Sequence, residues 1–420
     1  MALHTRQHTT DASRKHPFFI NRAFGLLWCG QTVSVLGSHI TSSGIPLIAI
    51  LVLGAHPAQI GLLAALGALP SLLFSLFIGV WVDRLPRRPL LLLADLARAL
   101  LLLMVPIASL SGLLHIQQLY LVTVLLSICT IFFDTAYQAF LPQITAYDQL
   151  VGGNSKLGIS SSLAEIGGPP LAGGLIQLLG APLAVLFDAL SFLVSALSIA
   201  LIRPREIQSI APAEMREPLW HEMYEGLHAL FSHPLLRTLV ISTTLRNFFG
   251  GAFLALYTIY IVRELSIVPV LYGLLIALGG VGALIGSLIT PRLTRRFGAK
   301  QMLICGTLLH SFLALLTPLA SGPTLLALGM LGISQLIGDI GFAFYSINEI
   351  SLLQSSIPAH IQGRANAVIG FLVSGIAPLG TLLAGVVSEY MGIRLTLLCG
   401  AGGMLLTAAC FAFALTKYQE

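Results

Sequence analysis

Residues 90–110 read LLLLADLARALLLLMVPIASL. A bilayer core about 30 Å thick is crossed by roughly 20 apolar residues in an α-helix, and this segment has that length and composition. Its only charged residues, Asp95 and Arg98, are three positions apart and therefore share one face of a helix. Because charges inside a membrane persist mainly when they are paired, we expect a membrane-spanning helix with an internal ion pair.

The rest of the chain resembles this segment. Of its 420 residues, 56% are hydrophobic and only 9% are charged, whereas about a quarter of the residues in a soluble domain are charged. The sequence therefore predicts an all-α membrane protein with twelve spanning helices. Their approximate ranges are 24–50, 59–81, 89–110, 117–140, 158–180, 182–202, 237–261, 270–290, 300–319, 323–347, 365–388 and 393–416.

One long polar stretch interrupts the apolar runs, between the sixth and the seventh. We therefore expect two six-helix bundles, at residues 24–202 and 237–416, joined by a linker at residues 203–236. Residues 1–23 and 417–420 are expected to form tails. The five cysteines lie in apolar runs without metal-ligand spacing, which predicts buried free thiols, no disulfide and no metal site. The first helix lacks the order of a cleavable signal peptide, so we expect it to remain in the protein.

The two predicted bundles repeat each other at one fixed offset. Gly61 and Gly273 are 212 positions apart, and the same offset relates Arg84 to Arg296. It continues without a gap through further pairs: Gly67 and Gly279, Ser75 and Ser287, Asn154 and Asn366, Gly158 and Gly370, Gly168 and Gly380, Gly173 and Gly385, and Gly180 and Gly392. Parallel six-helix repeats are typical of transporters whose halves rock around a site at the bilayer midplane.

The basic residues predict the orientation. Of the 22 Lys and Arg residues, Arg98 and Arg246 fall inside helices, and only Arg263 and Arg394 fall on the side opposite the termini and the linker. The positive-inside rule then places both termini in the cytoplasm, in a cell (inner or plasma) membrane. The net charge of +5 follows from this topology, so no nucleic-acid partner is expected.

Two motifs carry a resemblance to a known family. Residues 79–88, GVWVDRLPRR, resemble the cytoplasmic loop between helices two and three of the major facilitator superfamily, and residues 167–174, GGPPLAGG, resemble its antiporter motif. Residues 187–192 and 363–367 resemble the subgroup of macrolide efflux proteins and enterobactin exporters. The resemblance implies the major facilitator fold and transport by alternating access.

The loop motif predicts a gate, because Asp83 can meet a helix end or a basic partner and release it when the halves tilt. By resemblance, Asp134 completes a charge relay with Arg84 or Arg88. The gating candidates are Gly79, Asp83, Arg84, Arg87, Arg88, Asp95, Arg98 and Asp134. The alternatives are a solvated basic loop and, for Asp95 and Arg98, a structural ion pair. The resemblance implies that the antiporter motif seals one conformational state, whereas the alternative is that it serves helix packing alone. Its candidate residues are Gly167, Gly168, Pro169, Pro170, Gly173 and Gly174.

The energy source is expected to be an ion gradient, because no phosphate-binding GxxxxGK[ST] motif occurs. Proton coupling requires a carboxylate that titrates inside the membrane, and the candidates are Asp339, Glu165 and Asp188. Arg246, deep in the seventh run, is expected to meet an acid such as Asp339 or an anionic substrate group. The substrate-cavity candidates, including the polar face of the first helix, are Gln31, Ser34, Ser38, Phe132, Arg246, Asn247, Phe249, Phe253, Gln335 and Phe342.

These features favour proton-coupled efflux of an amphipathic or hydrophobic small molecule, such as a drug, a macrolide or a siderophore-like metabolite, by a monomer in the bilayer that needs no cofactor. A lipid flippase or a nutrient importer of the same fold is the nearest alternative. An enzyme would need a nucleophile or a His/Asp cluster, which the sequence does not show, and a non-transporting receptor would normally carry a soluble sensing domain.

Overall fold

The computed structural model describes residues 21–146, 149–202, 219–357 and 362–417. Its elements are α1 (Arg22–Leu51), α2 (Pro57–Arg84), α3 (Arg87–Leu110), α4 (Ile116–Ile144), α5 (Leu150–Leu179), α6 (Ala181–Leu201), α7 (Leu219–Ser232), α8 (Pro234–Ile259), η2 (Tyr260–Glu264), α9 (Pro269–Phe297), α10 (Ala299–Ala314), α11 (Leu316–Leu319), α12 (Thr324–Ser356), α13 (Gln362–Met391) and α14 (Ile393–Lys417). No strand occurs among these residues, as expected for the predicted fold class.

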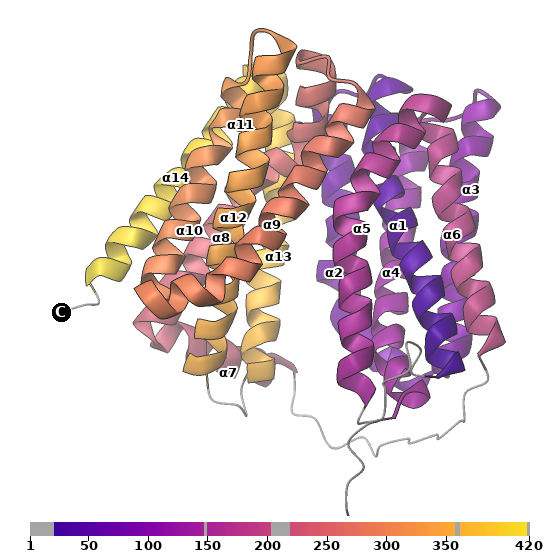
Figure 1. The fold of residues 1–420 in the computed structure, drawn as a ribbon, viewed down its shortest axis with the longest axis horizontal. Coiled ribbons are helices and arrows are strands. Elements are labelled where there is room, and N and C mark those ends of the chain that lie inside the picture. The colour runs from indigo at the N-terminus through magenta and orange to yellow at the C-terminus, as the bar shows by residue number, and fades with distance from the viewer. Residues whose placement is uncertain (1–20, 147–148, 203–218, 358–361, 418–420) are drawn as a thin grey trace, which may run out of the picture.

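The helices form two bundles that stand side by side, α1–α6 and α8–α14 (Figure 1). The bundles are two copies of one pattern, because the offset found in the sequence also separates their helix starts. The starts of α1 and α8, of α2 and α9, of α3 and α10, of α5 and α13, and of α6 and α14 are each 212 residues apart. α12, which is equivalent to α4, begins four residues before the position that this offset predicts.

Most of these helices are long and apolar enough to cross a membrane. Eleven meet that description among the described residues. α5 does not, because its first half carries Asn154, Lys156, Glu165 and a run of serines. It nevertheless runs the length of the bundle beside α1 and α9 (Figure 1), so the twelfth predicted helix is present but is the most polar of the set.

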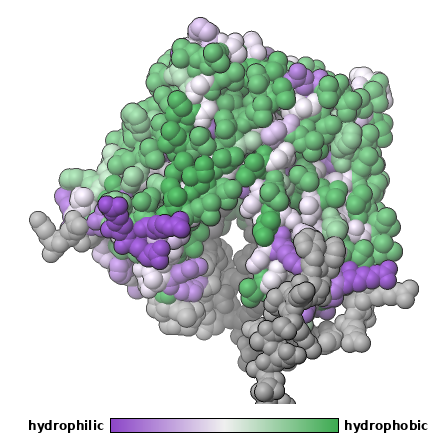
Figure 2. All heavy atoms as spheres, viewed as in Figure 1, coloured by the Kyte–Doolittle hydropathy of each residue, from purple (hydrophilic) through white to green (hydrophobic). Residues whose placement is uncertain are grey.

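Apolar side chains cover the outside of both bundles (Figure 2). On α3, for example, Leu93, Leu100 and Ile107 are exposed while Leu91 and Leu102 are fully buried. A helix that is apolar on both its buried and its exposed face suits a lipid environment. The cysteine prediction was wrong on burial for the same reason: the thiols are free, but Cys29, Cys305, Cys399 and Cys410 are exposed on helix surfaces.

The two halves join at one end of the molecule. We call this the far end, where α1 ends and α2 begins; the opposite end, which carries α7 and the start of α1, is the linker end. At the far end a Cβ on Gly173 of α5 would overlap the carbonyl oxygen of Pro269 on α9. The equivalent contact in the other pair of helices places Gly385 of α13 against Pro57 of α2. Only glycine permits backbones to approach this closely.

Three further contacts seal the far end. Gly61 of α2 lies against the carbonyl oxygen of Thr381, and its equivalent Gly273 of α9 lies against that of Pro169. The guanidinium of Arg263 donates a hydrogen bond to the carbonyl oxygen of Ile50, 3.0 Å away, across the two halves. At the linker end the surface is hollowed between the halves (Figure 2). The structure is therefore closed at the far end and open at the linker end.

The linker contains a helix that the sequence analysis did not predict. α7 (Leu219–Ser232) lies in the range assigned to the linker, and α8 begins at Pro234, also inside that range. Leu230 of α7 is fully buried among residues of α8, α12 and α13, which include Leu236, Leu353 and Val368. This helix was not predicted, because the charged residues of the linker conceal its short apolar face in the sequence.

Candidate functional site

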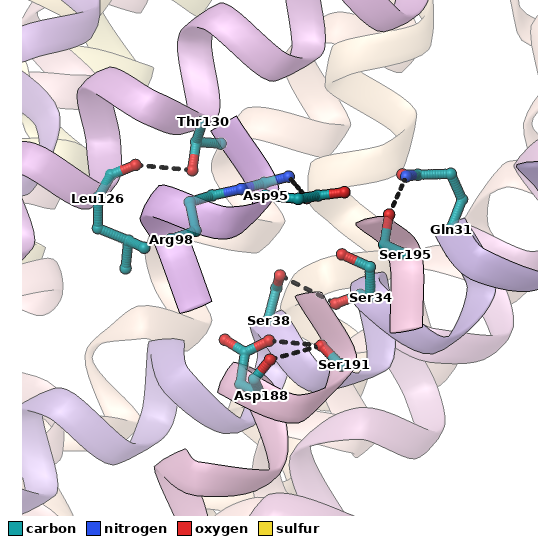
Figure 3. Close-up of polar contacts among 10 residues, drawn as sticks. All are labelled: Gln31, Ser34, Ser38, Asp95, Arg98, Leu126, Thr130, Asp188, Ser191 and Ser195. Carbon is teal, nitrogen blue, oxygen red and sulfur yellow. Dashed lines mark hydrogen bonds and ion pairs between the residues drawn. The ribbon is translucent and has the colours of Figure 1, made fainter. Parts of the chain in front are cut away.

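The N-terminal half holds a buried charged cluster at its centre (Figure 3). Arg98 and Asp95 of α3 form the predicted ion pair and are almost completely buried. The guanidinium of Arg98 lies between two rings, 4.1 Å from the centre of Phe133 and 4.2 Å from that of Phe192. Two aromatic faces and one carboxylate therefore compensate the desolvation of this cation.

Two more acids surround the same arginine. Arg98 interacts electrostatically with Asp134 of α4 and with Asp188 of α6. No ion pair joins Asp134 to Arg84 or Arg88 in the part of the chain that the structure describes. In this conformation Asp134 therefore interacts with Arg98, and the charge relay with Arg84 or Arg88 stays a prediction.

The polar face predicted to line the substrate cavity is partly packed against α6. Gln31 of α1 donates a hydrogen bond to the hydroxyl of Ser195, 3.2 Å away, and Ser34 is also buried. Asp188 accepts a hydrogen bond of 2.9 Å from Ser191. In this conformation Gln31 and Ser34 therefore do not face an open surface, since both are buried and Gln31 bonds to Ser195 of α6. Their assignment to the substrate cavity stays a prediction. Ser38, whose hydroxyl bonds to the carbonyl oxygen of Ser34, is half-buried.

The predicted gating loop contacts its own half. Arg88 donates hydrogen bonds to the carbonyl oxygens of Ile199 (3.3 Å) and Ala200 (2.6 Å) at the C-terminal end of α6. A cation at this end of a helix meets unpaired carbonyl groups and the negative end of the helix dipole. Arg84 is exposed and Arg87 is half-buried. The side chains of Gly79 and Asp83 lie outside the described residues.

The antiporter motif in α5 divides into two faces. Gly168, Pro169 and Gly173 are buried: Gly168 lies against the side chain of His39 on α1, and the other two contact α9. Gly167 and Gly174 face open space, where an added Cβ would meet nothing within 4 Å. One face of the motif thus forms the far-end seal, and the other contributes nothing to it. Pro170 is half-buried, beside Gly273 of α9.

Glu165, two residues before this motif, is exposed on α5. It interacts electrostatically with His39 in its own half and with Asp339 in the other half. Two of the three predicted proton-coupling acids therefore interact across the boundary between the halves, whereas Asp188 lies inside the N-terminal half.

Arg246 is buried in the C-terminal half, with 8% of its surface exposed. Its guanidinium lies 4.1 Å from the ring centre of Tyr345 and 5.4 Å from that of Phe342. The acid that interacts with it electrostatically is Glu349 and not the expected Asp339. Glu349 in turn accepts hydrogen bonds from the hydroxyls of Tyr345 and Thr243.

A cavity of about 320 Å³ lies inside the C-terminal half, among α8, α9, α10, α11, α12 and α14. It brings together Asp339 and two predicted cavity residues, Phe253 and Gln335. Its other lining residues are Gly250, Leu254, Tyr257, Ile276, His310, Ala314, Thr317, Ser334 and Met404.

The remaining cavity candidates are dispersed. Asn247 bonds to the carbonyl oxygen of Thr243, and the ring of Phe249 packs on Gly403 of α14. Phe132 stacks on Trp81 at a ring separation of 6.3 Å, and Phe342 is exposed. The predicted cavity residues therefore form no single pocket in this conformation, and two of them, Phe253 and Gln335, share the C-terminal cavity.

Sequence analysis missed His310 and Tyr345, although the internal repeat could have indicated both. His310 is 212 positions after Arg98, and Tyr345 is 212 positions after Phe133. In both halves the aromatic ring at this position lies under an arginine guanidinium. No cluster of three or more metal-ligating side chains occurs among the described residues.

Comparison with known proteins places the chain in a family. The family described as "Transmembrane secretion effector" matches residues 13–420. The chain is 27% identical to the multidrug efflux pump Tap of Mycolicibacterium fortuitum, over 84% of this chain and 86% of that protein. It is also 27% identical to macrolide efflux protein A of Streptococcus pyogenes, over 88% and 90% of the two chains.

The fold is shared with solved transporters. A bacterial homologue of the iron transporter ferroportin in its inward-facing state superimposes with a TM-score of 0.74 at 20% identity, covering 94% of this chain and 99% of that one. In the outward-facing state, at 19% identity and covering 95% and 100% of the two chains, its TM-score is 0.55. The chain belongs to the transmembrane secretion effector family of the major facilitator superfamily, and it is a membrane transporter rather than an enzyme.

Proposed function

We propose that this protein is a secondary active exporter that carries a drug-like, amphipathic or hydrophobic molecule out of the cell in exchange for protons, by alternating access. The observation that carries the proposal is the glycine seal at the far end combined with the opening at the linker end. These contacts join the halves from the far end to about the middle of α5 and α9, so a rocking motion can open the far end while closing the linker end.

The direction of transport is inferred from the relatives. Tap is named as a multidrug efflux pump and the streptococcal relative as a macrolide efflux protein. With the basic loops and both termini in the cytoplasm, the linker end faces the cell interior. The structure then has its opening on the side from which an exporter loads its cargo.

The proton is the proposed counter-ion because carboxylates lie inside the membrane-spanning region. Asp339 lines the C-terminal cavity and interacts electrostatically with Glu165 across the two halves. An acid at such a depth is costly unless it serves ion transfer or is paired. No ion pair involves Asp339 among the described residues.

The proposal is tested with inverted membrane vesicles from cells that express the protein. Vesicles energised with a proton gradient should accumulate a transported compound, found by screening the strain for increased resistance to diverse toxic compounds that include macrolides. Adding that compound should release protons from the vesicle lumen. If no compound changes resistance and the vesicles instead move labelled phospholipid between leaflets, the drug-export proposal is wrong and a flippase is the better description.

The predicted gate has its own test in the same vesicles. Asp83→Asn should reduce export strongly, because the loop between α2 and α3 would lose its only acid. Export at the wild-type rate would show that this loop only satisfies the positive-inside rule.

A further inference from the structure

The cavity inside the C-terminal half is lined by both a carboxylate and an imidazole. Asp339 extends from α12 and His310 from α10. Every residue that lines this cavity belongs to the C-terminal half. Most of the wall of this cavity is apolar, but at about 320 Å³ the cavity is large enough to hold water molecules beside its polar groups.

The hydrogen bond of His310 defines its chemistry. Its Nδ1 lies 3.0 Å from the carbonyl oxygen of Gly338. A carbonyl oxygen only accepts hydrogen bonds, so Nδ1 carries a hydrogen and Nε2 is left as the basic nitrogen. Gly338 directly precedes Asp339. The backbone that presents the carboxylate therefore also holds the imidazole.

Asp339 is not required for packing at its position, as the other half shows. Ser127 of α4 is 212 positions before Asp339, and Gly67 of α2 is 212 positions before Gly279. The Ser127 hydroxyl donates a 2.9 Å hydrogen bond to the carbonyl oxygen of Gly67. In the C-terminal half the Asp339 carboxylate lies against Gly279, where a Cβ would overlap its Oδ2. A serine satisfies this helix contact in one half, whereas the other half places a titratable acid there.

The next residue of α9 connects this acid to the N-terminal half. A Cβ on Gly280 would lie 3.2 Å from Cγ1 of Ile166 and 3.5 Å from the carbonyl oxygen of Glu165, both on α5. Gly279 and Gly280 thus touch Asp339 and the Glu165 segment, respectively. At these two glycines the backbone of α9 lies between Asp339 and the α5 segment that carries Glu165, and the two acids interact electrostatically.

We propose, as a deepening of the proton-coupled export proposed above, that Asp339 and His310 form the proton-binding site around this cavity and that Gly279 and Gly280 transmit its occupancy to α5. One proton moves between Nε2 of His310 and the carboxylate of Asp339. When the carboxylate holds the proton, its charge is neutralised and its repulsion of Glu165 is removed. The α5–α9 contact then stays closed at the far end.

Loss of that proton restores two negative charges on either side of α9 and favours separation of α5 and α9. This sense suits an exporter: protonation from outside returns the carrier to the state that is open at the linker end, and cargo loading there accompanies proton release. The other groups that face the two proton carriers or their electrostatic partners are Tyr257 and Arg246 on α8, Tyr272 on α9, Tyr345 and Glu349 on α12, and His39 on α1.

The proton site is tested without any substrate. Purified protein in lipid nanodiscs is examined by infrared difference spectroscopy between acidic and alkaline pH, which detects the C=O band of a protonated carboxyl. Asp339→Asn should remove one band, and His310→Gln should shift the pH at which this band appears. Ser127→Ala, the equivalent position of the other half, should leave the spectrum unchanged. A spectrum unaltered by Asp339→Asn, or a titration unaltered by His310→Gln, would overturn the proposal.

Transmission is tested with Gly280→Val, which crowds the α5 contact without touching the acid. This variant should keep the carboxyl band but lose substrate-driven proton release in vesicles that contain the compound identified by the resistance screen. Release at the wild-type level would overturn the transmission step. If wild-type vesicles show no substrate-driven proton release while the band depends on Asp339 and His310, the site stands and the export proposal fails. If release occurs and the band ignores both residues, export stands and this site fails.

Discussion

The two halves of the molecule share one backbone plan but use charge differently. In the N-terminal half, Arg98 is fixed to Asp95 by an ion pair and held between two rings. At the equivalent positions of the C-terminal half stand His310 and Thr307, and Arg246 stacks on Tyr345 from another helix. At this position the N-terminal half thus carries an arginine paired with an aspartate, whereas the C-terminal half carries a histidine and a threonine.

The contacts that join the two halves are the same in both halves. Gly61 and Gly273, and likewise Gly173 and Gly385, make the same backbone contacts with the opposite half. A repeat can vary its buried charges as long as each half satisfies them internally, whereas a seal made by both halves requires matching small residues. On the proposed mechanism, the shared glycines take part in the motion of the halves and the differing side chains take part in proton coupling.

The largest effect is expected at the shared seal. Gly173→Leu should abolish transport, because its side chain would overlap the backbone of Pro269 and prevent far-end closure. Gly174→Leu is the matched control in the same motif, since its position faces open space. Export measured in vesicles distinguishes the two variants. Equal activity of both would show that the α5 contact is not part of the transport cycle.

The ion pair of Asp95 and Arg98 should dominate the stability of the N-terminal half. Arg98→Ala leaves Asp95 buried without its partner, which should cost about 3–5 kcal/mol of unfolding free energy. Replacing both residues by apolar ones of similar size, as in Asp95→Leu with Arg98→Met, should recover most of that loss. Denaturant unfolding in detergent micelles measures both. If the double variant is as unstable as Arg98→Ala, the ion pair contributes more to stability than offsetting the cost of burying its own two charges.

The two stacked rings give a direct comparison of the halves. Phe133→Leu and Tyr345→Leu should each cost about 1–2 kcal/mol, because each removes one aromatic face from a buried arginine. Tyr345→Phe keeps the face and loses only the hydroxyl bonds to Thr243 and Glu349, which should cost about 1 kcal/mol. Thermal unfolding in the same detergent ranks the three variants. A larger loss for Tyr345→Phe than for Tyr345→Leu would remove the stacking argument.

The smallest effect is expected at the linker end of α6. Arg88→Ala removes two hydrogen bonds to the last carbonyl groups of this helix and should cost up to about 1 kcal/mol. Arg292→Ala, an exposed arginine on α9 without such a bond among the described residues, should change stability by less than about 0.5 kcal/mol. Indistinguishable melting temperatures would contradict a capping role for Arg88.

Much of the fold could be predicted from the sequence, because lipid imposes length and composition on each spanning helix. The helices around residues 90–110 and 182–202 were clear for this reason, and the glycine register anticipated the repeat. α5 was less clear, since it combines serines, glycines and Glu165 with its apolar residues. α7 was missed because its buried face is short and its neighbours are charged.

The candidate site was less predictable, because its partners come from different helices. The ion pair of Asp95 and Arg98 is local to one helix, so spacing alone revealed it. The partner of Arg246 could not be found this way: Glu349 reaches it from α12, and Asp339 points to α9 instead. Likewise, nothing in the spacing of Gln31 and Ser34 shows that α6 supplies Ser195 as a hydrogen-bond partner.

The central claim, that transport requires the far-end seal to open, is tested most directly by locking that seal. The Gln177 side chain of α5 and the backbone of Val270 on α9 meet there at 3.3 Å. Cysteines at both positions can be joined by a short bis-methanethiosulfonate reagent that reductant removes, with each single variant as control for the native thiols. We expect cross-linking to stop export and reduction to restore it in the double variant alone. Export at the full rate by the cross-linked protein would contradict alternating access through this seal.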